Sequence, residues 1–258
     1  MGKSEAVESS GKINRWHVAI AGVVMQLLLG SVYAWSVFKK PLMESHGWSN
    51  SSVGLTFTFV NVFIGVSAAF GGRFVDKAGA RKVATTGAIL FGLGTLLAGL
   101  ADKVGSIWLL WIGYGLIGGI GNGLGYVTPV AILVRWFPDK RGFITGLAVM
   151  GFGFGAALMG KIAPLIIPHV GVANTFFLFG ILYLICLLPA ASRLNNPPAT
   201  WTPPAPVQVK AKSDAVTVSE DLPQALRMPQ FYLLWGVLFI NVTAGLSIIS
   251  NLSPMGQI

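Results

Sequence analysis

The sequence predicts an all-α membrane protein with several transmembrane helices, and three observations lead to this fold class. Only 10% of the 258 residues are charged and 53% are hydrophobic, whereas a soluble domain usually carries roughly 25% charged residues. The apolar residues are concentrated in seven continuous stretches, each long enough for the roughly 20 residues that cross a bilayer. The chain also holds 33 glycines, a residue type that lets membrane helices pack backbone to backbone.

The apolar stretches are continuous rather than alternating, so they indicate transmembrane helices and not a β-barrel. The predicted spans cover residues 16–38, 53–72, 83–101, 107–133, 143–165, 172–191 and 231–250. The first span is too long for the core of a signal peptide and has no small-residue cleavage pattern, so we expect it to remain in the protein.

The distribution of positive charge predicts the orientation of these spans. All of the 18 basic residues except Lys39, Lys40, Lys103 and Lys161 fall on the same side of the predicted membrane. The positive-inside rule then places the N-terminus in the cytoplasm of a protein integral to the cell (inner) membrane. The net charge of +9 is thereby accounted for by contact with membrane lipid, and we expect no nucleic-acid partner.

The order of the segments predicts a domain organisation. Residues 1–15 form a predicted cytoplasmic tail, 16–191 a six-helix bundle, 192–230 a cytoplasmic linker and 231–258 a seventh helix. The linker is rich in proline, which favours an extended, semi-rigid segment. Two-bundle membrane proteins of six plus six helices join their halves in this way, so we expect the seventh helix to begin an incomplete C-terminal bundle.

A charged motif lies between the second and third predicted spans, in what the sequence predicts to be a short cytoplasmic loop. It reads Gly72-Arg-Phe-Val-Asp-Lys-Ala-Gly-Ala-Arg-Lys82 and resembles the signature loop of the major facilitator superfamily, with alanine at one basic position. The residues that fit are Gly72, Asp76, Lys77, Gly79, Arg81 and Lys82. The glycines allow a tight reversal, and the acid among cations can form ion pairs that break and reform during gating.

Further motifs resemble the oxalate/formate antiporter branch of that superfamily. They are Gly30–Phe38 in the first span, the glycine series ending at Tyr126 in the fourth, Arg135–Gly142 after it, and Asn251–Pro254 after the seventh. The resemblance covers the family's first seven helices. It implies a secondary transporter that exchanges small carboxylates of the oxalate/formate or lactate/pyruvate type by alternating access.

Several polar side chains within the spans are candidates for binding a small organic anion. Polar groups at this depth are costly against lipid, so they should face the bundle interior. The candidates are Gln26, Tyr33, Trp35, Asn61, Asn122 and Tyr126. Gln26 and Tyr33 share a helix face and favour a cavity, Asn61 and Asn122 fit a cavity or helix packing equally, and Trp35 also fits an outer interface or packing.

Other residue types exclude several functions. All nine acidic residues and the three histidines fall in loops or at span ends, so we expect no buried carboxylate relay. A single cysteine, Cys186, leaves no disulfide within the chain and no Cys/His metal site. The glycines of the fourth span lie in lipid and not in a phosphate-binding loop. We therefore expect no enzyme, no cofactor and no metal.

No arginine or lysine lies near the middle of a predicted span, although an ionised substrate that leaves water needs a charged or strongly polar partner. In the resembled family such basic residues belong to the second bundle. Two alternatives therefore stay open: a truncated or split-gene half that inserts but transports only with its C-terminal half supplied in trans, and a non-transporting membrane scaffold.

Overall fold

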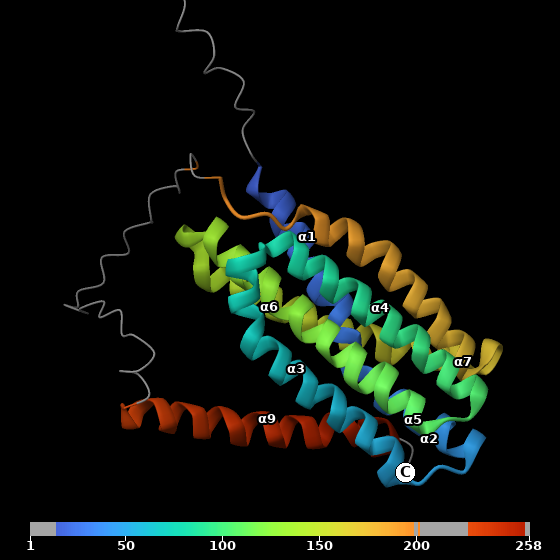
Figure 1. Ribbon diagram of the computed structural model, residues 1–258. Helices are drawn as coiled ribbons and strands as arrows, with labels where there is room; N and C mark the ends of the chain where they lie inside the picture. The colour runs from blue at the N-terminus through green and yellow to red at the C-terminus, as the bar shows by residue number, and fades with distance from the viewer. Residues whose placement is uncertain (1–13, 199–200, 202–226, 256–258) are drawn as a thin grey trace, which may run out of the picture.

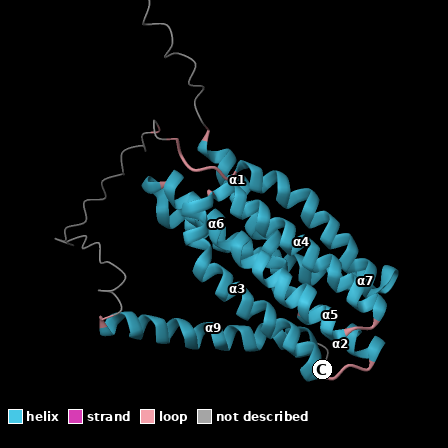
Figure 2. Ribbon diagram, in the orientation of Figure 1, coloured by secondary structure: helices cyan, strands magenta, loops and turns pink. Residues whose placement is uncertain are grey.

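The computed structural model describes residues 14–198, 201 and 227–255, and every regular element among them is helical (Figure 2). The predicted tail 1–15 and linker 192–230 lie largely outside the described residues. Six helices of the described part are long and apolar enough to cross a membrane. The chain is thus an all-α membrane bundle, as the sequence predicts.

The first predicted span, 16–38, matches a helical stretch that is not one uniform α-helix. It consists of α1 (Arg15–Gly30), a 3₁₀ turn η1 (Ser31–Ala34) and α2 (Ser36–His46) (Figure 1). The α1 helix begins where the side chain of Asn14 accepts a hydrogen bond from the Trp16 amide. The 3₁₀ turn η1 has fewer residues per turn than an α-helix. Tyr33 and Trp35 therefore point in directions that an ideal 3.6-residue period does not predict.

The next three long elements match the second, third and fourth predicted spans. They are α3 (Asn50–Ala78), α4 (Ala80–Val104) and the fourth span, formed by α5 (Ile107–Leu110), the π-helical η2 (Trp111–Gly118) and α6 (Gly119–Trp136). Ser49 and Ser106 accept amide hydrogen bonds at the starts of α3 and α5. Gly47 and Gly105 adopt positive φ at the ends of α2 and α4.

The fifth and sixth predicted spans are two helices that meet at Gly171 and share the label α7 (Arg141–Arg193, 53 residues), after the short η3 (Pro138–Lys140). A straight helix of that length would be roughly 80 Å long, far beyond a bilayer of roughly 30 Å. The chain reverses at Gly171, whose φ of 82° and ψ of 169° are not helical. This backbone region is open essentially only to glycine.

Glycines bring the helix backbones together, as the glycine content of the sequence predicts. A Cβ atom built on Gly155 would lie 1.8 Å from the carbonyl oxygen of Leu27, and one on Gly30 would lie 1.8 Å from that of Phe152. Gly87 and Gly121 form further close contacts between α4 and α6, where a built Cβ would lie 2.7 Å and 2.3 Å from the nearest backbone atom. These contacts join α1 to the first half of α7 and α4 to α6, so the prediction is confirmed.

The last described element, α9 (Pro229–Met255), corresponds to the seventh predicted span. It begins two residues before the predicted position because Pro229 is compatible with the first turn of a helix. Figure 1 shows its N-terminal end diverging from the bundle, while it contacts α2 and η1. Most of its described large apolar side chains are exposed, which suits a helix that faces lipid or a further bundle.

Candidate functional site

Two buried amide side chains join α1 to α6 at the centre of the bundle. Gln26 Nε2 donates to the carbonyl oxygen of Tyr126 at 3.2 Å, and Asn122 Nδ2 donates to that of Leu29 at 2.8 Å. Both side chains are fully buried, and neither amide oxygen has a hydrogen-bond partner among the described residues. Leaving such an acceptor unpaired costs about 1–3 kcal/mol, so the pair offers unused acceptors as well as donors engaged with backbone.

An aromatic cluster lies beside these amides. The ring of Tyr33 lies 5.3 Å from that of Phe152 and 6.1 Å from that of Phe57, and Tyr126 lies 5.1 Å from Phe152, all edge-on. Tyr33 and Tyr126 are half-buried. Each phenol ring therefore packs against a neighbouring ring and leaves part of its surface exposed. We call Tyr33, Tyr126, Phe57 and Phe152 the tyrosine cluster.

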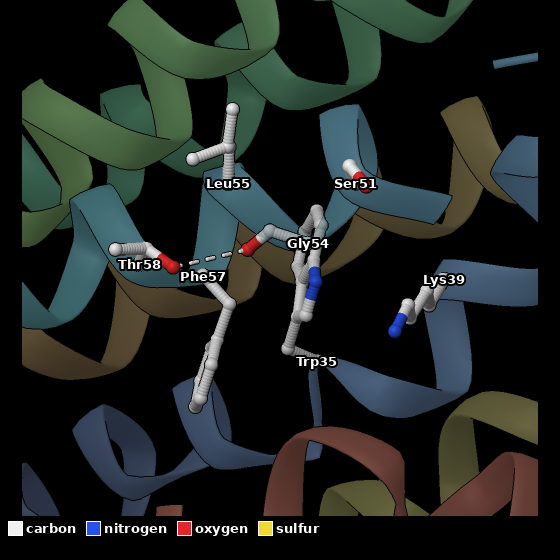
Figure 3. Close-up of a pocket in the computed structure, with 7 residues that line it drawn as sticks. All are labelled: Trp35, Lys39, Ser51, Gly54, Leu55, Phe57 and Thr58. Atoms are coloured by element: carbon white, nitrogen blue, oxygen red, sulfur yellow. Dashed lines mark hydrogen bonds between the residues drawn. The ribbon is translucent and has the colours of Figure 1, made fainter. Parts of the chain in front are cut away.

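The remaining sequence candidates take separate positions. Asn61 donates its side-chain amide to Phe57 of its own helix at 2.8 Å, so the structure does not bring it into contact with the amide pair. Trp35 is 1% exposed and its ring stacks on that of Tyr114 at 5.1 Å. It lines a pocket together with Lys39 of α2 and residues of the first half of α3 (Figure 3), and Gln26 is not part of that lining.

The charged motif between the second and third spans is not a loop in the structure. Asp76 and Lys77 lie in the last turn of α3, Arg81 and Lys82 in the first turn of α4, and Gly79 alone separates the helices. The φ of 89° at Gly79 supplies the reversal that the sequence predicts from a glycine. The helices extend this far because a single glycine is enough to turn the chain.

Asp76 pairs with a residue outside its own motif. Its carboxylate accepts from Arg135 of α6 at 2.6 Å, and Arg135 also donates to Asn196 at 3.0 Å. The ion pair therefore ties the end of α3 to the end of α6. The sequence did not predict this partner, although Arg135 begins one of the motifs quoted above. The spacing within the charged motif suggested instead that Asp76 pairs with the cations of that motif.

A second ion pair lies at the same end of the bundle. Arg15 at the start of α1 donates to both carboxylate oxygens of Asp139, the longer contact being 2.9 Å, and its guanidinium lies over the ring of Phe137. The hydrogen bond from Arg15 holds the pKa of Asp139 below its ordinary value. We call the end of the bundle that carries the Arg15–Asp139 and Asp76–Arg135 ion pairs the basic end.

Asp139→Asn should lower the thermal stability of the protein in detergent at pH 7, by about 1 kcal/mol for a partly exposed pair. The depressed pKa means that the contribution of Asp139 is present above the unfolded value of about 3.9 and is lost as pH falls through the folded value. The difference in Tm between wild type and variant should therefore shrink on acidification to about pH 3. Equal Tm values at pH 7 would contradict this role.

The sequence of this chain is similar to a known protein family and to several named proteins. The family model described as Major Facilitator Superfamily matches residues 18–258. The oxalate:formate antiporter of Oxalobacter formigenes is 28% identical over 100% of this chain and 59% of its own length. An uncharacterized MFS-type transporter of Escherichia coli K12 is 26% identical over 94% of the chain and 58% of its own length. Monocarboxylate transporter 14 of Mus musculus is 29% identical over 70% of the chain and 35% of its own length. The chain thus spans less than two thirds of the length of each of these relatives.

Proposed function

The chain belongs to the Major Facilitator Superfamily, and from this premise we propose that it forms the N-terminal bundle of a secondary transporter for small carboxylates. The family and its named relatives indicate a transporter rather than an enzyme. The proposed orientation places the basic end in the cytoplasm, in accord with the distribution of basic residues. The proposed mode is exchange by alternating access, in an inner membrane.

The grouping of the amide pair and the tyrosine cluster carries this proposal. The amide pair joins α1 to α6, and the tyrosine cluster brings together η1, α3, α6 and α7. Together they offer phenol hydroxyls and amide groups, which can hydrogen-bond a carboxylate. Because Gln26 and Asn122 are bonded across that interface, contact with a substrate requires the two helices to separate slightly. Neutral hydrogen bonds of about 1 kcal/mol each can exchange in this way at low cost.

The second bundle has a defined part in this proposal. It supplies the opposite wall of the cavity and the cations that offset the charge of a carboxylate leaving water. The described part of α9 leaves most of its apolar side chains exposed, as expected of a helix that belongs to that second bundle. The chain would then transport only when the remaining helices are joined to it or supplied in trans.

Counterflow of labelled oxalate, formate or lactate in reconstituted vesicles tests the proposal directly. We expect exchange from the chain combined with its second bundle, and little from the chain alone. Absence of exchange with every small carboxylate, in a correctly inserted complete protein, would contradict a carboxylate transporter. Stable co-purifying proteins in that case would favour a membrane scaffold.

Asp76→Asn should slow exchange more than it weakens substrate binding. The substitution removes the charge that pairs with Arg135 across α3 and α6, and the pair can stabilise one conformation of the basic end but lies far from the tyrosine cluster along the helices. We expect turnover to fall about tenfold with a change in binding of less than twofold, because 1.4 kcal/mol in a barrier corresponds to about tenfold in rate. Radiolabel exchange and equilibrium binding measure the two quantities, and an equal loss in both would contradict a gating role.

A further inference from the structure

The first residues after α7 are docked onto the bundle. The sequence predicts them to belong to the extended linker 192–230, which would leave the bundle directly. Instead, α7 continues to Arg193, and the side chain of the next residue, Leu194, is 0% exposed. Figure 1 shows this segment, in orange, running from the end of α7 past the start of α1. We call residues 194–198 together with Trp201 the clamp.

Two contacts with Trp136, the last residue of α6, hold the clamp in place. The indole Nε1 of Trp136 donates to the backbone carbonyl oxygen of Asn195 at 2.7 Å, and its ring lies 5.3 Å from that of Trp201, edge-on. Trp136 is only 2% exposed, and its N–H can only donate, so the carbonyl satisfies a buried donor. The backbone amide of Trp201 also donates to the carbonyl oxygen of Pro198 at 2.9 Å, which ties Trp201 to the rest of the clamp.

Asn196 attaches the clamp to the Asp76–Arg135 ion pair. Nη1 of Arg135 donates to the side-chain oxygen of Asn196 at 3.0 Å, while Nη2 of the same guanidinium donates to Asp76 at 2.6 Å. The donors of a guanidinium have fixed relative positions, so an acceptor on one nitrogen restricts where the other can point. The side chains of Arg135 and Asp76 are 41% and 63% exposed, and an exposed pair is weak because ordering two side chains costs entropy. Asn196 therefore orders a guanidinium that the pair alone would hold loosely.

The clamp also lies beside the start of α1. Asn195, Asn196 and Pro198 line one pocket together with Asn14 and His17. The clamp is thus next to both α1 and α6, the two helices that the amide pair joins at the centre of the bundle. A displacement of the clamp would reach both of these helices at the basic end.

From the two contacts with Trp136 and the Arg135 guanidinium shared by Asn196 and Asp76, we infer that the clamp fixes the start of the linker to α6. Asn196 is a positioning residue, which holds Arg135 in the orientation that pairs with Asp76. Displacement of the linker then acts directly on the ion pair. The docking of the clamp depends on these contacts alone, whereas its effect on exchange rests on the proposed function.

Limited trypsin digestion of the full chain in lipid nanodiscs tests the docking. The bond after Arg193 leads into the buried Leu194, so cleavage there requires release of the clamp and follows the population of the released state. Trp201→Ala removes the ring contact with Trp136 and should accelerate this cleavage about threefold or more. Trp108→Ala is the matched control, because this tryptophan is 68% exposed at the opposite end of the same span. Mass spectrometry of the fragment that begins at Leu194 measures the rate, and equal rates for the two variants would overturn the docking.

Trp136→Phe gives a second, separate measurement of the docking. It removes the indole N–H that bonds to the Asn195 carbonyl and keeps an aromatic ring against Trp201. Cleavage after Arg193 should again be faster, by about threefold or more, because one hydrogen bond to the clamp is lost. A monodisperse size-exclusion profile confirms that the variant is folded. A rate equal to that of wild type would contradict the role of this bond.

Exchange by the complete transporter tests the effect on the ion pair. Asn196→Ala should slow exchange about threefold, because Arg135 loses the acceptor that orients it. Asn195→Ala is the matched control on the adjacent residue and should leave exchange unchanged, since Trp136 bonds to its backbone carbonyl and not to its side chain. Asn196→Asp keeps an acceptor oxygen for Arg135 and should restore exchange. Equal loss in the alanine and aspartate variants of Asn196 would overturn the positioning role.

A double-mutant cycle separates positioning from a general loss of structure. In the Asp76→Asn background, Arg135 no longer has a carboxylate to pair with, so Asn196→Ala should slow exchange no further. Residues that act through a shared partner show such non-additive effects. Losses that multiply in the double variant would show that Asn196 acts independently of the ion pair and would overturn the inference.

Failure of this inference can be told apart from failure of the proposed function, because trypsin digestion needs no transport activity. Faster cleavage on release of the clamp, in a complete protein that exchanges no carboxylate, would support the docking and reject carboxylate transport. The Asn196–Arg135 contact is then measured by cleavage, since Asn196→Ala and Arg135→Gln break the same hydrogen bond and should accelerate cleavage non-additively. Exchange that is equal in Asn196→Ala and Asn195→Ala would reject the positioning role alone.

Discussion

Gly155→Ala is expected to destabilise the bundle by about 3 kcal/mol or more, the upper end of the range for overpacked interiors. The reason is the contact between α1 and α7, where a Cβ on Gly155 would lie 1.8 Å from the carbonyl oxygen of Leu27. A backbone oxygen within a helix cannot rotate away as a side chain can, so the two helices must separate. Gly30→Ala, whose Cβ would meet the Phe152 carbonyl oxygen, should have the same effect on the other side of this interface.

Gly153 is the matched control, two residues away on the same helix, because a Cβ at this position meets no atom within 4 Å. Alanine is favoured over glycine in a helix interior by roughly 0.5–1 kcal/mol, so Gly153→Ala should be neutral or slightly stabilising. Thermal unfolding of the purified variants in detergent, followed by size exclusion, measures both. A Tm for Gly155→Ala equal to that of Gly153→Ala would show that the α1–α7 contact is not as close as described.

Tyr33→Phe and Gln26→Ala should each reduce carboxylate exchange about tenfold or more in the complete transporter. Hydrogen bonds to charged groups contribute about 1.5–3 kcal/mol. Removing one donor to a carboxylate should raise the barrier to exchange by that amount, which corresponds to a fall in rate of about tenfold or more. Tyr33→Phe keeps the ring contacts with Phe57 and Phe152 and should leave stability unchanged. Gln26→Ala also removes the hydrogen bond to the Tyr126 carbonyl, so its Tm should fall modestly.

One comparison makes this prediction specific. Gln26→Leu keeps most of the volume of glutamine and removes the unpaired amide oxygen, so it should recover stability but not exchange. Normal exchange by both Tyr33→Phe and Gln26→Ala would place the substrate elsewhere in the protein.

Much of the fold is predictable from this sequence because membrane insertion depends on local apolar length. The seven spans, the reversal at Gly79 and the close contact at Gly155 all follow from residues adjacent in the chain or one helical turn apart. The 3₁₀ turn at Ser31–Ala34 was not predicted. Hydropathy is averaged over a window, and a change of helix type does not change the polarity of the residues in it.

The candidate site is predictable only in part. The inward orientation of Gln26 and Asn122 follows from the cost of a polar group in lipid, and both are buried. Whether such an amide contacts a substrate or a neighbouring backbone is not encoded in its spacing, since both roles require the same orientation. The Asp76–Arg135 pair depends on a contact between separate helices, which a single sequence does not specify.

The reversal at Gly171 leaves no connecting loop between the two halves of α7. The half before it packs against α1, where Gly155 meets Leu27, and the half after it packs against α4, where Gly180 meets Leu96. We therefore expect a tilt of one half to displace the other, and a flexible segment inserted at Gly171 to uncouple the two.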